Sequence, residues 1–467
     1  MLKNPLHKLS YFIGKRFLSI SLAAIIMYVP SFDWEGIGFE DCGNLLMAQN
    51  VFHQSDVQWV AIPNHVNWLY QVGEKASIEV QVLEHGVPQD DIEIRYRLAQ
   101  DCLSSDTEGT VVTREGKAVI PVGTMKQPGF RDCVMVCTLH GRTYQNHLKV
   151  GFSPELLKPF TRTPKDFDSF WKKILDEQSQ LPLQCEVFPA SEYATDKVDC
   201  YKFKLRCHSK DDSHYIYGYL TRPKKPGKYP IVISPPGAGV KPMNPNKTLF
   251  YAEQGFVRLD LEIHGIDPAL SAEIYKDITR AFGDHHSNGY LANGIYSRDT
   301  YYLKKVYAAL VRAVDYAVTL PEWDGRNLFI QGASQGGALG IVLAALDPRI
   351  TAACINHPAL SDMAAYAEKG KTGGYPHFGR KYKNVSLTEE VIHTLSYYDV
   401  VSFAPRVKCP IYMTWGFNDN VCPPTTSYVV WNLLQCPKES LITPINEHWV
   451  SMETRKAQLE WLKRQMR

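Results

Sequence analysis

The sequence predicts an α/β protein with a mostly parallel sheet, preceded by a small immunoglobulin-like β-sandwich, and two patterns carry this prediction. From about Val57 to Gly151, short runs alternate apolar and polar residues, with turn signals such as His85-Gly86 between them. That alternation is typical of strands that bury one face. Further along, the expected strands are short and apolar, and longer helical segments such as Tyr301–Val318 separate several of them. Strands of that kind belong to a parallel sheet that helices cover on both faces.

Length and charge narrow the classes of protein that fit. The chain has 467 residues, about three times the usual size of one domain. It carries 51 Lys and Arg against 49 Asp and Glu, a formal net charge of +2, so it lacks the basic excess of a nucleic-acid-binding protein. No apolar run reaches the roughly 20 residues that a membrane-spanning helix needs. We therefore expect two or three globular domains, with no nucleic-acid partner and no stable membrane span.

Residues 1–48 have the pattern of a secretory signal region. The apolar stretch Phe17–Val29 is too short for a stop-transfer helix, and it follows a basic segment containing Lys3, Lys8, Lys15 and Arg16. The cleavage site is not sharply defined, and the best position is near Ala48. This pattern predicts a secreted or periplasmic protein; a buried N-terminal helix or an anchor is the alternative.

The cysteines indicate neither a disulfide framework nor a metal site. The chain has 11 cysteines, but no two of them form a C-x-x-C pair. Clustered Cys and His ligands of the zinc-site type are also missing. We therefore expect most of the cysteines to be buried and unpaired, and we expect no metal and no cofactor.

The predicted boundaries place the β-sandwich at residues 50–152 and the α/β domain at residues 153–467. In the joint between them, Thr163 and Pro164 are typical of the start of a helix. Two antiparallel strands are expected next, at Tyr201–Arg206 and Tyr215–Thr221. The apolar strands that follow are expected at Pro230–Ser234, Val257–Leu261, Leu328–Gln331, Ala352–Asn356 and Ile411–Trp415.

Ser334 lies at the centre of a G-x-S-x-G motif, between Gly332 and Gly336. The apolar strand Leu328–Gln331 precedes the motif, and the small, apolar segment Ala338–Leu346 follows it as a helix. In the α/β-hydrolase fold, this strand–turn–helix exposes a nucleophilic serine, and the glycines relieve crowding at the turn. The sequence therefore predicts an α/β-hydrolase with Ser334 as nucleophile; an ordinary glycine-rich turn is the alternative.

A nucleophilic serine needs a base, and the base needs an acid that orients it. In this fold the chain order is Ser, then Asp or Glu, then His. His448 is the only histidine after Trp415, which makes it the predicted base. Asp419 is the predicted acid, because it follows the strand Ile411–Trp415 and a short turn. The rival acidic residues for this role are Asp347, Asp362, Asp399 and Glu447.

The oxyanion of the tetrahedral intermediate needs two N–H donors. One is expected to be the backbone N–H of Gln335, directly after the serine, and the other to come from the loop after the strand Ile231–Ser234. That loop begins with two prolines, which have no N–H. The second donor is therefore Gly237, Ala238 or Gly239.

These residues resemble the acetyl xylan esterase and cephalosporin C deacetylase family of carbohydrate esterases over roughly residues 160–467. The matching runs include F-D-S-F-W at Phe167–Trp171, G-A-S-Q-G-G at Gly332–Gly337 and D-N-V-C-P-P-T at Asp419–Thr425. The resemblance implies a serine esterase that removes acetyl groups from sugar hydroxyls. It implies the triad Ser334, Asp419 and His448, with Gln335 and Ala238 as oxyanion donors. The family has a tyrosine in a G-Y-N run where Ala238 stands, so the acyl pocket differs here.

The predicted function is deacetylation of O-acetylated carbohydrate, of the xylan or xylo-oligosaccharide type, through an acyl-enzyme. A serine peptidase of the prolyl-oligopeptidase type is one alternative, but roughly 100 residues of β-sandwich cannot build the large propeller of those enzymes. A non-catalytic carbohydrate-binding protein is the other, and it would have no need of all three triad residues. Family members commonly form oligomers, so a homo-oligomer is possible. The sandwich holds no candidate catalytic residue, and we expect its deletion to spare hydrolysis of small esters.

Overall fold

The computed structural model describes residues 56–207, 214–281, 289–382 and 384–467. The predicted signal region, residues 1–48, lies outside the described residues. Residues 56–467 form one compact unit that contains both the sandwich and the α/β part. Within the described residues, none of the helices is long and apolar enough to cross a membrane.

The ten cysteines in this part of the chain are all free, and seven of them are buried, as the sequence predicts.

Two sheets that share one apolar core form the predicted sandwich. The alternating residues Ile78, Val80 and Val82 of one sheet and Ile94 of the other are buried in that core. One sheet contains β1 (Val57–Pro63), β3 (Ala76–Glu84), β4 (Val87–Pro88) and β7 (Ala118–Gly123). The other runs β2 (Leu69–Tyr70), β9 (Arg142–Phe152), β8 (Gly129–Leu139), β5 (Glu93–Gln100) and β6 (Ser105–Val112).

A nine-stranded sheet forms the centre of the α/β part and confirms the predicted fold class. Its order is β10 (Cys185–Pro189), β11 (Val198–Arg206), β12 (Tyr215–Pro223), β14 (Val257–Glu262), β13 (Tyr229–Ser234), β15 (Trp323–Ala333), β16 (Ala352–Asn356), β17 (Ile411–Trp415) and β18 (Lys438–Ile442). The pairs from β10 to β14 are antiparallel, and those from β14 through β13 to β18 are parallel. The β16 and β17 bounds are those predicted from the sequence, because both strands are mostly apolar, with one polar residue each (Asn356 and Thr414), and are buried at every position.

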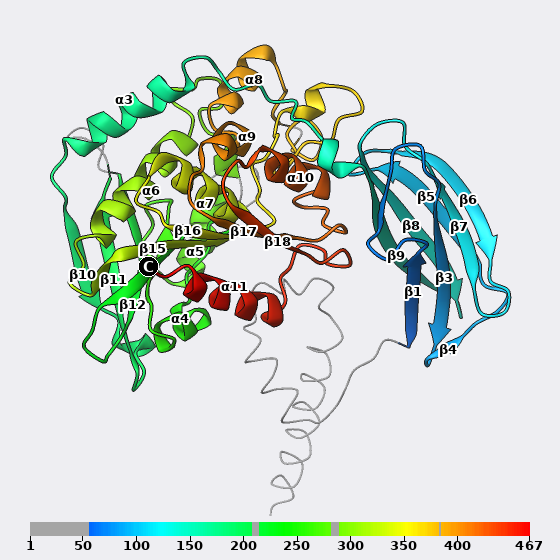
Figure 1. Cartoon of the computed structure of the whole chain (residues 1–467), viewed down its shortest axis with the longest axis horizontal. Coiled ribbons are helices and arrows are strands. Elements are labelled where there is room, and N and C mark those ends of the chain that lie inside the picture. The colour runs from blue at the N-terminus through cyan, green and yellow to red at the C-terminus, as the bar shows by residue number, and fades with distance from the viewer. Residues whose placement is uncertain (1–55, 208–213, 282–288, 383) are drawn as a thin grey trace, which may run out of the picture. The chain divides into compact units, whose positions relative to one another are not determined.

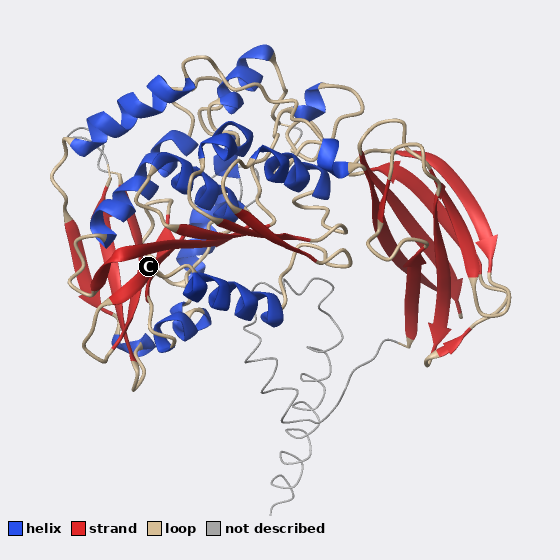
Figure 2. Cartoon of the chain, viewed as in Figure 1, coloured by secondary structure: helices blue, strands red, loops and turns tan. Residues whose placement is uncertain are grey.

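Helices cover both faces of this sheet, as the blue ribbons on either side of the red strands show (Figure 2). The larger core lies under α3 (Phe167–Ser179), α5 (Ala272–Ala281), α6 (Leu303–Ala317), α7 (Gln335–Leu346), α8 (Glu389–Ser396), α9 (Val400–Phe403) and α10 (Pro424–Leu433). On the opposite face, α4 (Leu249–Glu253) and α11 (Met452–Arg464) lie together (Figure 1). There, Tyr251 and Trp461 pack against Val232, Phe329 and Tyr412 of the sheet.

Short 3-10 turns connect several of these elements, and one predicted helix start is wrong. The turns are η1 (Pro154–Leu156), η2 (Ser191–Tyr193), η3 (Pro245–Lys247), η4 (Gly289–Ala292), η5 (Ala365–Ala367) and η6 (Ala404–Arg406). The sequence predicts that α3 is capped by Thr163 with Pro164 in its first turn, but the helix begins at Phe167. A separate turn, in which the Phe167 N–H donates to the Pro164 carbonyl, lies between the proline and the helix. Proline therefore precedes the helix rather than opening it.

The parallel strands bring distant parts of the sequence to one edge of the sheet. The loop with Ala238 follows β13, Ser334 follows β15, Asp419 follows β17 and His448 follows β18. Because these strands are parallel, their carboxyl ends lie at the same edge, which is where open α/β sheets bind ligands. The candidate site is therefore built from loops that are more than 200 residues apart in the chain.

Candidate active site

Ser334 occupies a sharp turn between β15 and α7. Its backbone has φ +58° and ψ −123°, a conformation that L-residues rarely adopt and that aims the side chain out of the turn. A side chain on Gly332 would collide with the Gly336 carbonyl, and one on Gly336 would collide with the Pro235 carbonyl. Both glycines are therefore required by close backbone contacts, which is the physical reason for the G-x-S-x-G pattern.

The structure brings Ser334, His448 and Asp419 into one hydrogen-bonded array. The Ser334 hydroxyl lies 3.0 Å from Nε2 of His448, and Nδ1 of His448 lies 2.7 Å from Oδ2 of Asp419. With Nδ1–H donating to the carboxylate, Nε2 is left as the acceptor that can take the serine proton. The three residues that sequence reasoning selected are thus within reach of one another in the order that base-assisted attack by a serine needs.

The Asp419 carboxylate is held rigidly from behind. It is fully buried, and its Oδ1 accepts hydrogen bonds from the backbone N–H groups of Val421, at 2.7 Å, and Cys422, at 2.8 Å. Burial alone would raise the pKa of Asp419, but the hydrogen bond and charge of His448, together with His357 and the Cys422 N–H, hold the pKa below its ordinary value. The carboxylate is therefore ionised and leaves Oδ2 directed at the imidazole.

Three groups beside His448 set its charge state. Burial opposes protonation, but the Cys422 thiol and the Asp419 carboxylate favour the imidazolium, and the pKa of His448 stands above its ordinary value. The ring of His357 lies 4.3 Å from that of His448, between centroids. Burial and the adjacent His448 lower the pKa of His357 to about 3, so His357 is neutral. His448 is the basic member of this histidine pair.

The loop after β13 and the start of α7 supply the candidate N–H donors for the oxyanion. The Gly239 N–H donates to the hydroxyl of Tyr290 at 3.2 Å, so it is not available to bind the oxyanion. In the described part of the chain, the N–H groups of Gly237, Ala238 and Gln335 have no such acceptor. The Tyr290 hydroxyl in turn donates to Oε1 of Gln335 at 2.6 Å. Of the three donors that the sequence left open, Gly237 and Ala238 remain.

Comparisons with known proteins show the family of this chain. The sequence profile of the acetyl xylan esterase family (AXE1) matches residues 155–465. The acetyl esterase Axe7A of Xylanibacter ruminicola is 53% identical over 422 residues, which are 90% of this chain and 93% of that protein. This chain belongs to the acetyl xylan esterase family. Membership makes it an esterase and confirms the resemblance seen in its sequence motifs.

Solved structures of the acetyl xylan esterase family share the α/β part. The acetyl xylan esterase from Paenibacillus sp. R4 is 26% identical, with a TM-score of 0.57, and the match covers 67% of this chain and 98% of that one. Acetyl xylan esterase 1 from Thermoanaerobacterium sp. JW/SL YS485 has the same TM-score and coverage at 22% identity, which shows the fold alone. The 422 residues aligned with Axe7A are more than residues 155–465 can supply, so that alignment also extends into the sandwich.

The rival acidic residues have other partners in this member of the acetyl xylan esterase family. Asp347 pairs with Arg349, its Oδ2 2.6 Å from the guanidinium. Asp362 accepts the N–H groups of Phe160 and Thr161, and Asp399 caps α9 through the Val401 N–H. Glu447 turns away from the site toward His147 of the sandwich, at 3.4 Å.

Four features near the site escape sequence reasoning. The Cys422 thiol lies 4.0 Å from the Ser334 hydroxyl, and it has no signal in the sequence beyond the D-N-V-C-P-P run. Tyr290 supports the oxyanion side without belonging to any motif. The segment 370–380 is largely buried, and Nε2 of its His377 lies 3.0 Å from the Val421 carbonyl. Finally, Lys149 of the sandwich contacts the Asp419 backbone.

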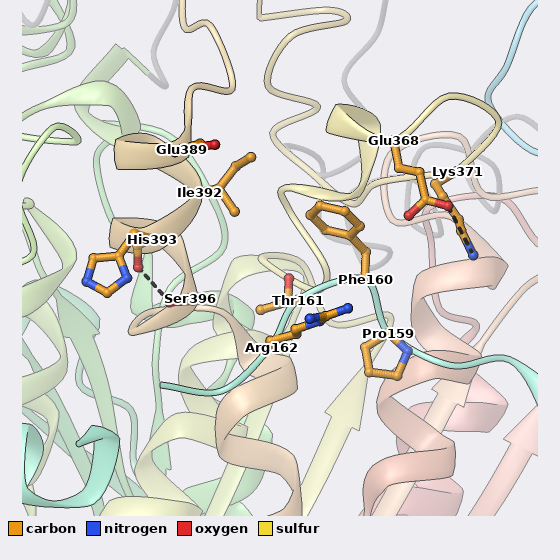
Figure 3. A pocket seen from close by; sticks show the side chains of 10 residues that line it. All are labelled: Pro159, Phe160, Thr161, Arg162, Glu368, Lys371, Glu389, Ile392, His393 and Ser396. Atoms are coloured by element: carbon orange, nitrogen blue, oxygen red, sulfur yellow. Dashed lines mark hydrogen bonds and ion pairs between the residues drawn. The ribbon is translucent and has the colours of Figure 1, made fainter. Parts of the chain in front are cut away.

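Two further places in the described part of the structure bear on ligand binding. His357, Asp419 and His448 each present one possible metal-ligand atom, all within 4.8 Å of one another. A metal there would have to displace the bond between Asp419 and His448, so this set fits a hydrogen-bonded array better than a metal site. A pocket of about 470 Å³ lies between the chain before α3 and the segments around η5 and α8 (Figure 3). None of the three array residues is among its lining, which is Pro159, Phe160, Thr161, Arg162, Glu368, Lys371, Glu389, Ile392, His393 and Ser396.

Proposed function

We propose that this protein is a serine esterase that removes acetyl groups from O-acetylated carbohydrate of the xylan or xylo-oligosaccharide type. The observation that carries the proposal is the continuous array from Ser334 through His448 to Asp419, with the serine in a strained turn between β15 and α7. Membership of the acetyl xylan esterase family and the name of the relative Axe7A, an acetyl esterase, support the acetyl group as the acyl part.

The proposed reaction has two steps through an acetyl-enzyme. Ser334 Oγ attacks the acetyl carbonyl carbon while Nε2 of His448 takes the hydroxyl proton. The N–H groups of Gln335 and Ala238 stabilise the oxyanion, and its collapse breaks the bond to the sugar oxygen, which takes the proton from His448. Water then attacks the acetyl-Ser334 ester with His448 again as base, and acetate leaves. Asp419 keeps the imidazole in the right tautomer and balances the charge of the imidazolium.

A set of substrates tests this proposal directly. Release of p-nitrophenol should be fastest from the acetate ester and slower from the butyrate and octanoate esters, and an amide of the same leaving group should stay intact. Acetylated xylo-oligosaccharide should release acetate, measured by chromatography or an enzyme-coupled assay. A maximum at octanoate would indicate a lipase-like enzyme, and cleavage of the amide would indicate a peptidase.

We also propose that the protein acts outside the cytoplasm, on the basis of the signal-like pattern in residues 1–48. A polymeric or oligomeric acetylated substrate would be met there. N-terminal sequencing of protein recovered from the medium or periplasm tests the proposal and defines the cleavage site. Intact protein that keeps Met1 in the cytoplasmic fraction would contradict it.

A further inference from the structure

Strand β9 of the sandwich reaches the loop that carries Asp419. The side chain of Lys149 is fully buried, and its ammonium donates to the backbone carbonyl of Asp419 at 2.7 Å. The backbone N–H of the same residue donates to Oδ1 of Asn418 at 2.9 Å. One sandwich residue therefore holds two successive residues of the loop, immediately behind the carboxylate that faces His448.

A second sandwich residue balances the charge of Lys149 and also hydrogen-bonds the segment that follows Asp419. Asp101, 1% exposed, lies with Oδ1 2.8 Å from the Lys149 ammonium. Its Oδ2 accepts from both the N–H (3.2 Å) and the hydroxyl (2.7 Å) of Thr425, at the start of α10. Burial opposes the ammonium, but Asp101 keeps the pKa of Lys149 above its ordinary value, so the pair is ionic.

A parallel bridge leads from the sandwich to the loop that carries His448. The His147 ring lies 3.3 Å from Asp132 and 3.4 Å from Glu447, the residue before His448. Burial disfavours its charge, but Asp132 and Glu447 keep the pKa of His147 above its ordinary value. Asp132 is the direct neighbour of Lys149 across β8 and β9. The two contacts, Lys149 with Asp419 and His147 with Glu447, thus start from one patch of the sandwich, formed by neighbouring residues of β8 and β9.

Apolar packing seats this patch against the α/β part. The ring of Phe130, in β8, lies 5.0 Å from that of Phe417 and 5.6 Å from that of Tyr428, between centroids. Phe130 is buried with the α/β core rather than with the core of its own sandwich. Since Phe417 precedes Asp419 by two residues, this packing supports the same loop from its other side.

We propose that Lys149 is a positioning residue for Asp419, and that the sandwich is therefore a working part of the esterase site. The proposal rests on the proposed function, because it assigns Asp419 the role of orienting His448. It replaces the expectation that removal of the sandwich spares small-ester hydrolysis. Lys149 reaches no substrate, so its loss should lower kcat and leave KM nearly unchanged. A displacement of about 1 Å in such a group can cost roughly 100-fold in rate.

The test is Lys149→Met in the full-length chain, with Arg131→Met as matched control. Arg131 is a long basic residue in β8 that pairs with Asp106 inside the sandwich, and none of its hydrogen bonds reaches the α/β part. Each variant is assayed for kcat and KM on p-nitrophenyl acetate, for Tm, and by proton NMR for the low-field signal of His448 Nδ1–H. Because Met leaves the Asp101 carboxylate buried without its cation, Asp101→Asn/Lys149→Met is made as well.

We expect both Lys149 variants to lose about 10- to 100-fold in kcat at temperatures well below their Tm. The low-field signal should shift or broaden in both, and Arg131→Met should match the wild type in kcat and in this signal. Wild-type kcat in a folded Lys149 variant, or an equal loss in Arg131→Met, would overturn the proposal. If neither Lys149 variant folds, His147→Gln tests the wider claim, since this ring is partly exposed and contacts Glu447 beside His448: unchanged kcat and signal would overturn the proposal that the sandwich is a working part of the esterase site. Failure of the proposed function is seen separately, as wild-type turnover by Ser334→Ala.

Discussion

The two sides of Ser334 are held in place by different physical means. On the acid–base side, Asp419 and His448 sit on loops that meet charged residues of the sandwich, and Lys149 with Asp101 is buried there. On the oxyanion side, Gln335 and Gly239 are joined through the neutral hydroxyl of Tyr290, entirely within the α/β part. His264 adds a ring contact to Tyr290, 4.6 Å between centroids, and lies 3.3 Å from the Gly239 carbonyl.

The two kinds of support differ in how much is lost when one residue is removed. A buried ion pair loses much stability when only one partner is removed, because the other charge is left without compensation. A neutral hydroxyl that is removed costs only a modest amount, about 1 kcal/mol for its net hydrogen bond. We therefore expect graded losses on the oxyanion side and steep, coupled losses on the acid–base side.

The largest effect on kcat is expected from replacing Ser334, the nucleophile between the two sides. Ser334→Ala removes the nucleophile, and kcat on p-nitrophenyl acetate should fall by about 10⁴- to 10⁶-fold while Tm stays close to wild type. Ser402→Ala is the matched control, because Ser402 is also buried but donates to the Ser396 carbonyl away from the site. Turnover near the wild-type rate in folded Ser334→Ala would remove this serine from the mechanism.

The next test concerns coupling on the acid–base side. Asp419→Asn should lower kcat/KM by up to about 10⁴-fold, less than His448→Ala, because the carboxylate orients the base without taking its proton. Residues that act as one unit are non-additive, so the double variant should lose little more than His448→Ala alone.

The control for that coupling is Asp362→Asn combined with His448→Ala. Asp362 is buried and binds the Phe160 and Thr161 N–H groups, so its effect should multiply with that of His448→Ala. If the Asp419 and His448 losses multiply instead, or if Asp362 shows the coupling, Asp419 is the wrong acid.

The pH dependence sharpens the comparison, because the base His448 lies on the acid–base side, whereas burial lowers the pKa of His264 on the oxyanion side to about 4. Cys422 and Asp419 raise the pKa of His448 above its ordinary value of 6.5, while neutral His357 lies against its ring. The imidazolium cannot accept the serine proton, so kcat/KM should fall about tenfold per pH unit below this pKa. We expect the acid limb of the kcat/KM profile to have its midpoint above pH 6.5. A midpoint below pH 6.5 would show that the two neighbours do not favour the imidazolium.

The smallest effect is expected on the oxyanion side. Tyr290→Phe keeps the ring but removes the hydroxyl between Gly239 and Gln335, and we expect about a 5- to 10-fold loss in kcat, from about 1 kcal/mol of positioning. Tyr307→Phe is the matched control, since that buried hydroxyl donates to the Tyr398 carbonyl in the core. An equal loss of kcat in both variants would indicate a general effect of removing a buried hydroxyl. A loss above 10³-fold for Tyr290→Phe would show that this side is as strongly coupled as the other.

The sequence by itself determined what local patterns encode. Runs such as Ile411–Trp415 are apolar at all positions but Thr414, so the parallel strands could be located to within a few residues. The Ser334 turn is encoded by its glycines, because neighbouring carbonyls exclude a side chain at Gly332 and Gly336. Chain order then selected Asp419 and His448 as the partners, which the structure brings within hydrogen-bonding distance.

Only the tertiary structure decided how those residues are supported. Lys149 and Asp419 are 270 residues apart, and nothing in the alternating pattern of β9 distinguishes a lysine that faces solvent from one buried against a second domain. Tyr290 is likewise one buried tyrosine among many until its hydroxyl is seen between Gly239 and Gln335. Local periodicity reports which face of an element is buried, whereas the partner of a buried polar group depends on how distant elements pack. The supports of the site were therefore invisible in the sequence, although its central residues were not.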